Sequence, residues 1–130
     1  MALNLEIKER IGHTLKGRPE IRFALLYGSA AEGQPFRDLD IGIWVDRVLV
    51  PTTQDLDYAF VITTDLEKTM SCRTDVRVIN DAPLPFRYNV SCGIPLIIND
   101  RQAYFSFLER TWDEFLDFRP VAMAYLKELA

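Results

Sequence analysis

The chain has 130 residues, of which 48% are hydrophobic and 26% charged, which is the composition of a single globular domain over residues 1–130. The net charge of −4 argues against a protein that follows nucleic acid through a broad positive field. No segment has the roughly 18 apolar residues of a membrane span, and the charged N-terminus is unlike a signal peptide, so we expect a cytoplasmic protein.

Cysteine and histidine are scarce in this chain. The two cysteines, Cys72 and Cys92, are too few and too far apart for a zinc site, and we expect both to be buried apolar residues. With His13 as the only histidine, any catalysis would depend on carboxylates, hydroxyls and a hard cation.

Helix and strand patterns alternate through the first half. Apolar residues recur every fourth position from Leu3 to Leu15, which predicts an amphipathic helix. The almost wholly apolar run Ile21–Tyr27 predicts a central strand. A second strand is predicted over Asp38–Asp46, with one apolar face (Leu39, Ile41, Ile43, Val45) and one mixed face (Asp38, Asp40, Gly42, Trp44).

The second half continues this alternation. We expect Thr52 to cap a helix, followed by a strand over Thr74–Ile79, a short helix, and an edge strand over Ile94–Ile98. A long helix follows, which Pro120 should kink or break because proline lacks an N–H and clashes with the preceding turn. The pattern predicts an α/β fold with a mixed sheet of about four strands flanked by helices.

The last predicted helix is rich in aromatic residues, interspersed with charged ones. These aromatics either complete the core or form a protein interface, where a few buried anchors dominate the energy. We expect the Phe105 or Phe118 side to contact a partner protein or a second copy of the chain. The aromatic residues are Tyr104, Phe105, Phe107, Trp112, Phe115, Phe118 and Tyr125.

A Gly-Ser pair ends the first predicted strand. Gly28 lets a backbone approach a phosphate closely, and Ser29 offers a hydroxyl and N–H groups to an anion. On its own, a Gly-Ser pair after a strand is more often an ordinary turn and helix cap.

Two carboxylates share one face of the second predicted strand. Because Asp38 and Asp40 are two residues apart, their Cα atoms lie about 6.5 Å from each other on one side. They could chelate a divalent cation or simply be a solvated strand start. Burial beside Gly42 and Trp44 would be costly without a cation, which favours the metal interpretation.

A third carboxylate begins the next predicted strand. If that strand pairs beside the second, Asp75 faces Asp38 and Asp40, and the three would repel one another without a divalent metal. The alternative is that Asp75 pairs with Arg77.

These residues resemble a known family. The stretches LYGSAAEGQPFRDLDIGIWVD and RTDVRVIN are similar to the catalytic core of the polymerase-beta-like nucleotidyltransferases, in particular the minimal nucleotidyltransferases (MNT) of prokaryotes. That family has a strand ending in Gly-Ser, a DxD on the next strand and an acidic residue on a later one. The matching positions are Gly28, Ser29, Asp38, Asp40 and Asp75.

The resemblance implies a metal-dependent transfer of a nucleoside monophosphate, usually AMP from ATP, to a hydroxyl. Asp38, Asp40 and Asp75 would be catalytic and hold Mg²⁺ or Mn²⁺, while Gly28 and Ser29 would hold the phosphates. Many such proteins are antitoxins of a HEPN-domain ribonuclease, and some adenylylate a tyrosine of the toxin.

The chain departs from the family at the loop between the two strands. Family members often carry arginine at the position of Glu32 and serine where this chain has Arg37, so we expect Arg37 to contribute to nucleotide binding. One alternative is an inactive antitoxin that neutralises its toxin by binding alone. A DxD glycosyltransferase is disfavoured because it leaves the Gly-Ser pair unexplained and the chain offers little room for a sugar acceptor.

Overall fold

A computed structural model describes residues 5–34 and 38–129 of the chain, so the predicted residues Leu3 and Arg37 lie outside the described part. No helix in the described ranges is both long and apolar enough to cross a membrane. The elements in chain order are α1 (Leu5–Lys16), β1 (Ile21–Tyr27), β2 (Asp38–Val45), the 3-10 turn η1 (Thr52–Gln54), α2 (Asp55–Thr69), β3 (Arg73–Val78), α3 (Leu84–Ser91), β4 (Ile94–Ile98) and α4 (Arg101–Leu129).

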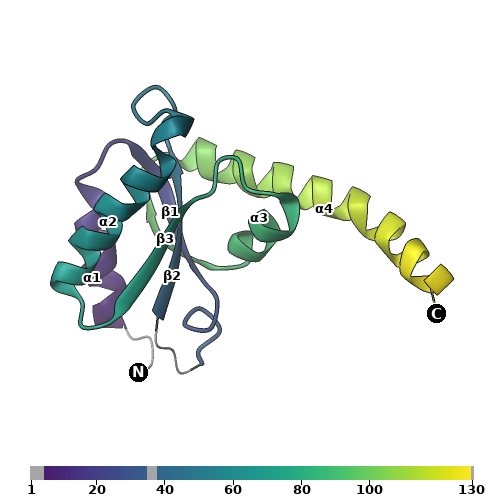
Figure 1. The fold of residues 1–130 in the computed structure, drawn as a ribbon, viewed down its shortest axis with the longest axis horizontal. Coiled ribbons are helices and arrows are strands. Elements are labelled where there is room, and N and C mark those ends of the chain that lie inside the picture. The colour runs from purple at the N-terminus through teal and green to yellow at the C-terminus, as the bar shows by residue number, and fades with distance from the viewer. Residues whose placement is uncertain (1–4, 35–37, 130) are drawn as a thin grey trace.

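The strands form one mixed sheet in the order β3-β2-β1-β4. β1 pairs antiparallel with both β2 and β4, whereas β2 pairs parallel with β3 through the α2 crossover. Helices α1 and α2 cover one face of the sheet, and α3 and α4 lie on the other (Figure 1). The predicted α/β fold, with a mixed four-stranded sheet flanked by helices, is confirmed.

The face toward α1 and α2 holds the larger core cluster. Strand alternation sends Leu39, Ile41 and Ile43 to this side, where all three are fully buried. They pack against the apolar stripes of the two helices, including Ile11 and Leu66. This side therefore accounts for most of the apolar burial that holds the fold together.

The face toward α3 and α4 is only partly covered by apolar groups. Phe23 is at its centre, with its ring centroid 5.2 Å from that of Tyr104 and 5.3 Å from that of Phe107 on α4. Gly42 lies beneath α3, and a Cβ placed there would lie 2.9 Å from Val90 Cγ1. The far end of the same face carries the acidic residues.

The structure corrects two local predictions. Thr52 is not the helix cap: it begins η1, and the N-cap of α2 is Gln54, which makes no side-chain capping bond. The start of α2 is held instead by Arg47, which donates to the carboxylate of Asp55. Cys92 is exposed rather than buried because it directly follows the end of α3, and Cys72 is half-buried.

Of the kink or break predicted at Pro120, the break is wrong. α4 continues through Pro120 to Leu129 and extends well beyond the sheet (Figure 1). Pro120 removes one helical hydrogen bond, whose acceptor would be the carbonyl of Leu116. Because this part of α4 is exposed, water can satisfy that carbonyl, which lowers the cost of the proline.

Candidate active site

Three residues on neighbouring strands form a row across the sheet. Tyr27 at the end of β1 is the register partner of Asp40 on β2, and Asp40 is the register partner of Asp75 on β3. Neighbouring strands are about 4.8 Å apart, and register partners point to the same face. The structure therefore brings Asp40 and Asp75 together on the α3 side of the sheet.

Asp38 lies at the entrance of this acidic end. It is the first residue of β2, it is exposed, and its register partner is Arg73 rather than an acidic residue. Within the described residues, no group of three or more His, Cys, Asp and Glu side chains converges closely enough to hold a metal ion. The three predicted aspartates share one end of one face, but their side chains do not form a closed cluster.

The electrostatics of this end are unfavourable for the negative charges. Burial, followed by the charges of Asp75 and Asp38, raises the pKa of the Asp40 carboxyl, and Arg77 opposes the rise. Burial, followed by the charges of Asp40 and Asp75, raises the pKa of Tyr27 to about 12. The Tyr27 hydroxyl is thus protonated at neutral pH. A cation beside Asp40 would reduce the repulsion that its carboxylate experiences from the neighbouring carboxylates.

Gly28 joins the first strand to a tight loop that touches Asp40. Its φ of +79° lies in the left-handed region, and a Cβ there would be 2.4 Å from Asp40 Oδ2. Glycine is required on both counts, because any side chain would be strained and would displace the carboxylate.

The loop after Gly28 is a series of turns rather than a helix. The Glu32 N–H donates to the carbonyl of Gly28, and the Gln34 N–H donates to the carbonyl of Ser29. Ser29 and Glu32 are exposed at this loop, beside the acidic end. A small cavity of about 60 Å³ opens here, lined by Tyr27, Gly28, Ala31, Glu32, Asn89, Cys92 and Gly93.

A second opening lies at the free edge of β3. This cavity of about 400 Å³ is lined by α2 on one side and by the outer strand residues 75–78 on the other. Asp75 and Arg77 therefore take part in both the acidic face and the outer edge of the sheet. A substrate could reach Asp75 without crossing the core.

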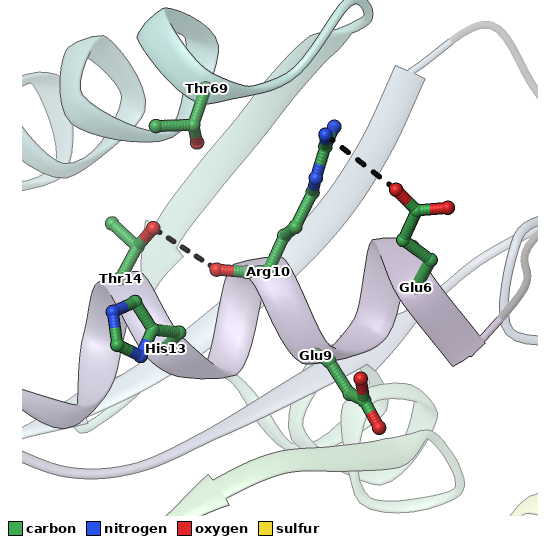
Figure 2. A pocket seen from close by; sticks show the side chains of 6 residues that line it. All are labelled: Glu6, Glu9, Arg10, His13, Thr14 and Thr69. Carbon is green, nitrogen blue, oxygen red and sulfur yellow. Dashed lines mark hydrogen bonds and ion pairs between the residues drawn. The ribbon is translucent and has the colours of Figure 1, made fainter.

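A cavity of about 570 Å³ lies elsewhere, between α1 and the end of α2. Figure 2 shows Arg10 turned toward Glu6 and Thr14 bonded to the Arg10 carbonyl, with Thr69 opposite. The Thr69 hydroxyl donates to the Leu66 carbonyl of its own helix, and α1 and α2 cover the face opposite the aspartates. The large volume of this cavity is therefore not evidence that it takes part in the chemistry.

The acidic end could hold a hard divalent cation. Asp40 carries a carboxylate destabilised by burial and by two neighbouring carboxylates, and oxygen ligands are those that Mg²⁺ and Mn²⁺ prefer. Gly28 leaves the Asp40 carboxylate uncovered at the point where a Cβ would collide with it. Asp40 and Asp75 fit such an ion as a pair of carboxylate ligands, with the rest of its coordination left to water or to nucleotide phosphates.

Sequence reasoning missed two members of this site. The sequence predicts Tyr27 only as a strand residue, although its position directly before Gly28 places it opposite Asp40 once β1 and β2 pair. Phe86 on α3 packs its ring edge-on against Tyr27, with centroids 5.5 Å apart. The strand pairing could have indicated Tyr27, whereas Phe86 depends on how α3 lies on the sheet.

Comparison with known proteins identifies the family. Residues 9–102 match the family model described as Polymerase beta, Nucleotidyltransferase, which covers more than half of the chain. The chain belongs to this nucleotidyltransferase family. No curated protein matches this nucleotidyltransferase significantly.

Solved structures share the fold of this nucleotidyltransferase at low sequence identity. A mutant of a MntA-HpeT toxin-antitoxin complex contains a chain with a TM-score of 0.73 and 18% identity, with 98% of both chains covered. A toxin-antitoxin structure with AMP-PNP gives a TM-score of 0.71 and 17% identity, covering 94% of this chain and 97% of the other. A structure of a tri-AMPylated Shewanella oneidensis HEPN toxin in complex with MNT antitoxin gives a TM-score of 0.69 and 16% identity, covering 95% of this chain and 96% of the other.

Proposed function

We propose that this nucleotidyltransferase transfers AMP from ATP to a hydroxyl group of a protein, and that it acts in the cytoplasm as the antitoxin of a HEPN ribonuclease toxin. The observation that carries the proposal is the Asp40 and Asp75 pair beside the Gly28 loop, within a family that transfers nucleotides. The similarity in fold to chains from HEPN and MNT complexes supports the choice of partner.

Each residue of the site has a role in this proposal. Asp38, Asp40 and Asp75 would hold Mg²⁺ or Mn²⁺, which when bound lowers the pKa of an attacking hydroxyl and stabilises a leaving pyrophosphate. Gly28 gives the phosphates close access to the backbone, and the exposed Ser29 offers them a hydroxyl. Arg37 remains a proposed contact to the nucleotide from the far end of the loop.

The test of the reaction uses labelled ATP, Mg²⁺ and the co-purified toxin. Asp40→Asn should abolish transfer of label to the toxin, because it removes a charged ligand without changing the shape of the side chain. The exposed helix residue Asp57 provides the matched control, since Asp57→Asn makes the same charge change away from the sheet. Label transfer by Asp40→Asn at the wild-type rate would refute the proposed site.

The same variant separates the catalytic antitoxin from the alternative that neutralises by binding alone. A catalytic antitoxin carrying Asp40→Asn still binds the toxin but no longer protects cells from it. If Asp40→Asn protects as well as the wild-type chain, and no label reaches the toxin, the binding-only function replaces the catalytic one.

We place the toxin contact on the outer half of α4. Phe118 is 50% exposed and Leu116 61%, and the helix that carries them extends beyond the sheet (Figure 1). The idea that all the aromatics complete the core is wrong for Phe105 and Phe118, whereas Tyr104 and Phe107 are buried. An exposed helix with this many apolar residues is stabilised by a partner that covers it.

Size-exclusion chromatography of the co-expressed pair tests this contact. Leu116→Asp and Phe118→Asp should release the toxin, because each buries a charge in the proposed interface. Phe60→Asp is the control: Phe60 is equally apolar and 72% exposed, but it lies on α2 across the sheet. Co-elution of both α4 variants at wild-type stoichiometry, with helical circular dichroism intact, would exclude this surface.

A further inference from the structure

Among the described residues, Arg77 is the positive charge that lies against Asp75 at the acidic end. It follows Asp75 by two residues on the same face of β3, and its Nη2 lies 3.5 Å from Asp75 Oδ2. Its charge also opposes the raised pKa of both Asp40 and Tyr27. One arginine thus acts on all three residues of the row across the sheet.

The contact between Arg77 and Asp75 is easily broken. The side chains are 58% and 47% exposed, and exposed ion pairs of this length contribute little to stability. The Arg77 guanidinium also lies over the Phe86 ring, with Cζ 5.6 Å from its centroid. Phe86 in turn packs against Tyr27, so the guanidinium has a second support at the rim of the site.

We infer that Arg77 is a mobile counter-ion of the nucleotide site: it holds Asp75 while no divalent cation is bound, and it contacts the nucleotide phosphates once a cation has taken its place. The inference rests on the proposed function. A divalent cation at Asp40 and Asp75 neutralises the charge that attracts Arg77. The released guanidinium matches a phosphate in shape and charge.

This arrangement gives Asp75 a positively charged partner within its own strand. Asp75 makes its ion pair with Arg77, which lies farther along β3 from Asp38 than Asp75 does. Arg77 therefore competes with a cation that binds alone and cooperates with a cation that arrives with nucleotide. Removal of the Arg77 charge should therefore strengthen the binding of the cation alone and weaken the binding of the nucleotide.

Two titrations measure these affinities separately. The first is Mn²⁺ alone, and the second is a non-hydrolysable ATP analogue at saturating Mn²⁺. In Arg77→Gln we expect the Kd for Mn²⁺ to fall about two- to fivefold, because an exposed competing ion pair is lost. We expect the Kd for the analogue to rise about tenfold or more, because a charged hydrogen bond to phosphate is lost.

The controls separate charge from packing. Arg77→Met keeps the aliphatic contact with Phe86 and should behave like Arg77→Gln, whereas Arg77→Lys keeps the charge without the planar fork and should restore only part of the analogue affinity. Arg101→Gln is the matched control, because Arg101 lies over the Phe105 ring at 5.9 Å in a similar contact away from the site. It should change neither affinity.

The outcomes distinguish the inference from the function on which it rests. If the wild-type chain binds Mn²⁺ but Arg77→Gln and Arg77→Met leave both affinities unchanged, or weaken both together, Arg77 is not a mobile counter-ion and the proposed function stands. If the wild-type chain binds neither Mn²⁺ nor the analogue, both are wrong. A tighter Mn²⁺ affinity with a weaker analogue affinity supports the inference.

Discussion

The two faces of the sheet use the same strands for different purposes. On β2, Ile41 points into the closed core under α1 and α2, while its neighbour Asp40 points to the partly open face under α3. The closed face buries apolar side chains and so stabilises the fold. The open face carries partly buried carboxylates, which are costly to remove from water. Because successive strand residues point to opposite faces, Ile41 contributes to the core while the adjacent Asp40 contributes to the candidate site.

The largest effect on stability is expected on the closed face. Ile41→Ala should lower the free energy of unfolding by about 2–5 kcal/mol, because Ile41 is fully buried and leaves a cavity. Urea denaturation measures the loss, with the adjacent Asp40→Asn as the comparison on the open face. A cost below about 1 kcal/mol would show that this face repacks freely.

A smaller effect is expected at the loop that meets the open face. Gly28→Ala should destabilise the fold by about 1–2 kcal/mol and also reduce nucleotide transfer, because the new Cβ meets Asp40 Oδ2. Gly33→Ala is the control: its φ is +75° but nothing lies within 4 Å of the added Cβ. Equal losses of transfer in both variants would assign the effect to loop strain alone.

The open face should also respond to a change of charge at its rim. Glu32→Arg should lower the KM for ATP by about fivefold, equivalent to about 1 kcal/mol, because it places a cation at the Gly28 loop, where we propose that the phosphates bind. Steady-state kinetics at fixed Mg²⁺ measures it. An unchanged or higher KM would place the phosphates away from Glu32.

The smallest effect is a pH dependence of the metal-free protein. Because the pKa of Asp40 is raised in the folded state, that state binds more protons than the unfolded chain, and Asp40 weakens stability as the pH rises through its pKa. Asp40→Asn should therefore be slightly more stable than the wild-type chain at pH 7, and the gain should vanish below the ordinary pKa of aspartate. Thermal unfolding across this range measures the difference, and a gain that persists in acid would contradict this origin.

Much of the candidate site was predictable because its signals are local. The alternation over β2 correctly separated Leu39, Ile41 and Ile43 from the aspartates, since successive side chains of a strand point to opposite faces. Gly28 was expected to let the backbone approach a phosphate, and that role remains a prediction; its positive φ and its closeness to Asp40 were not expected from the sequence. The catalytic and metal-binding roles of Asp38, Asp40 and Asp75 remain predictions, as do those of Ser29 and Arg37.

The remaining features depend on contacts between distant segments. Local periodicity and steric rules place each residue within its element, but only strand pairing aligns Tyr27, Asp40 and Asp75 in one row. The position of Arg77 between Asp75 and the Phe86 ring requires α3 to lie on the sheet. Likewise, Pro120 ends a helix by local rules, yet α4 continues past it because its exposed backbone can bond to water there.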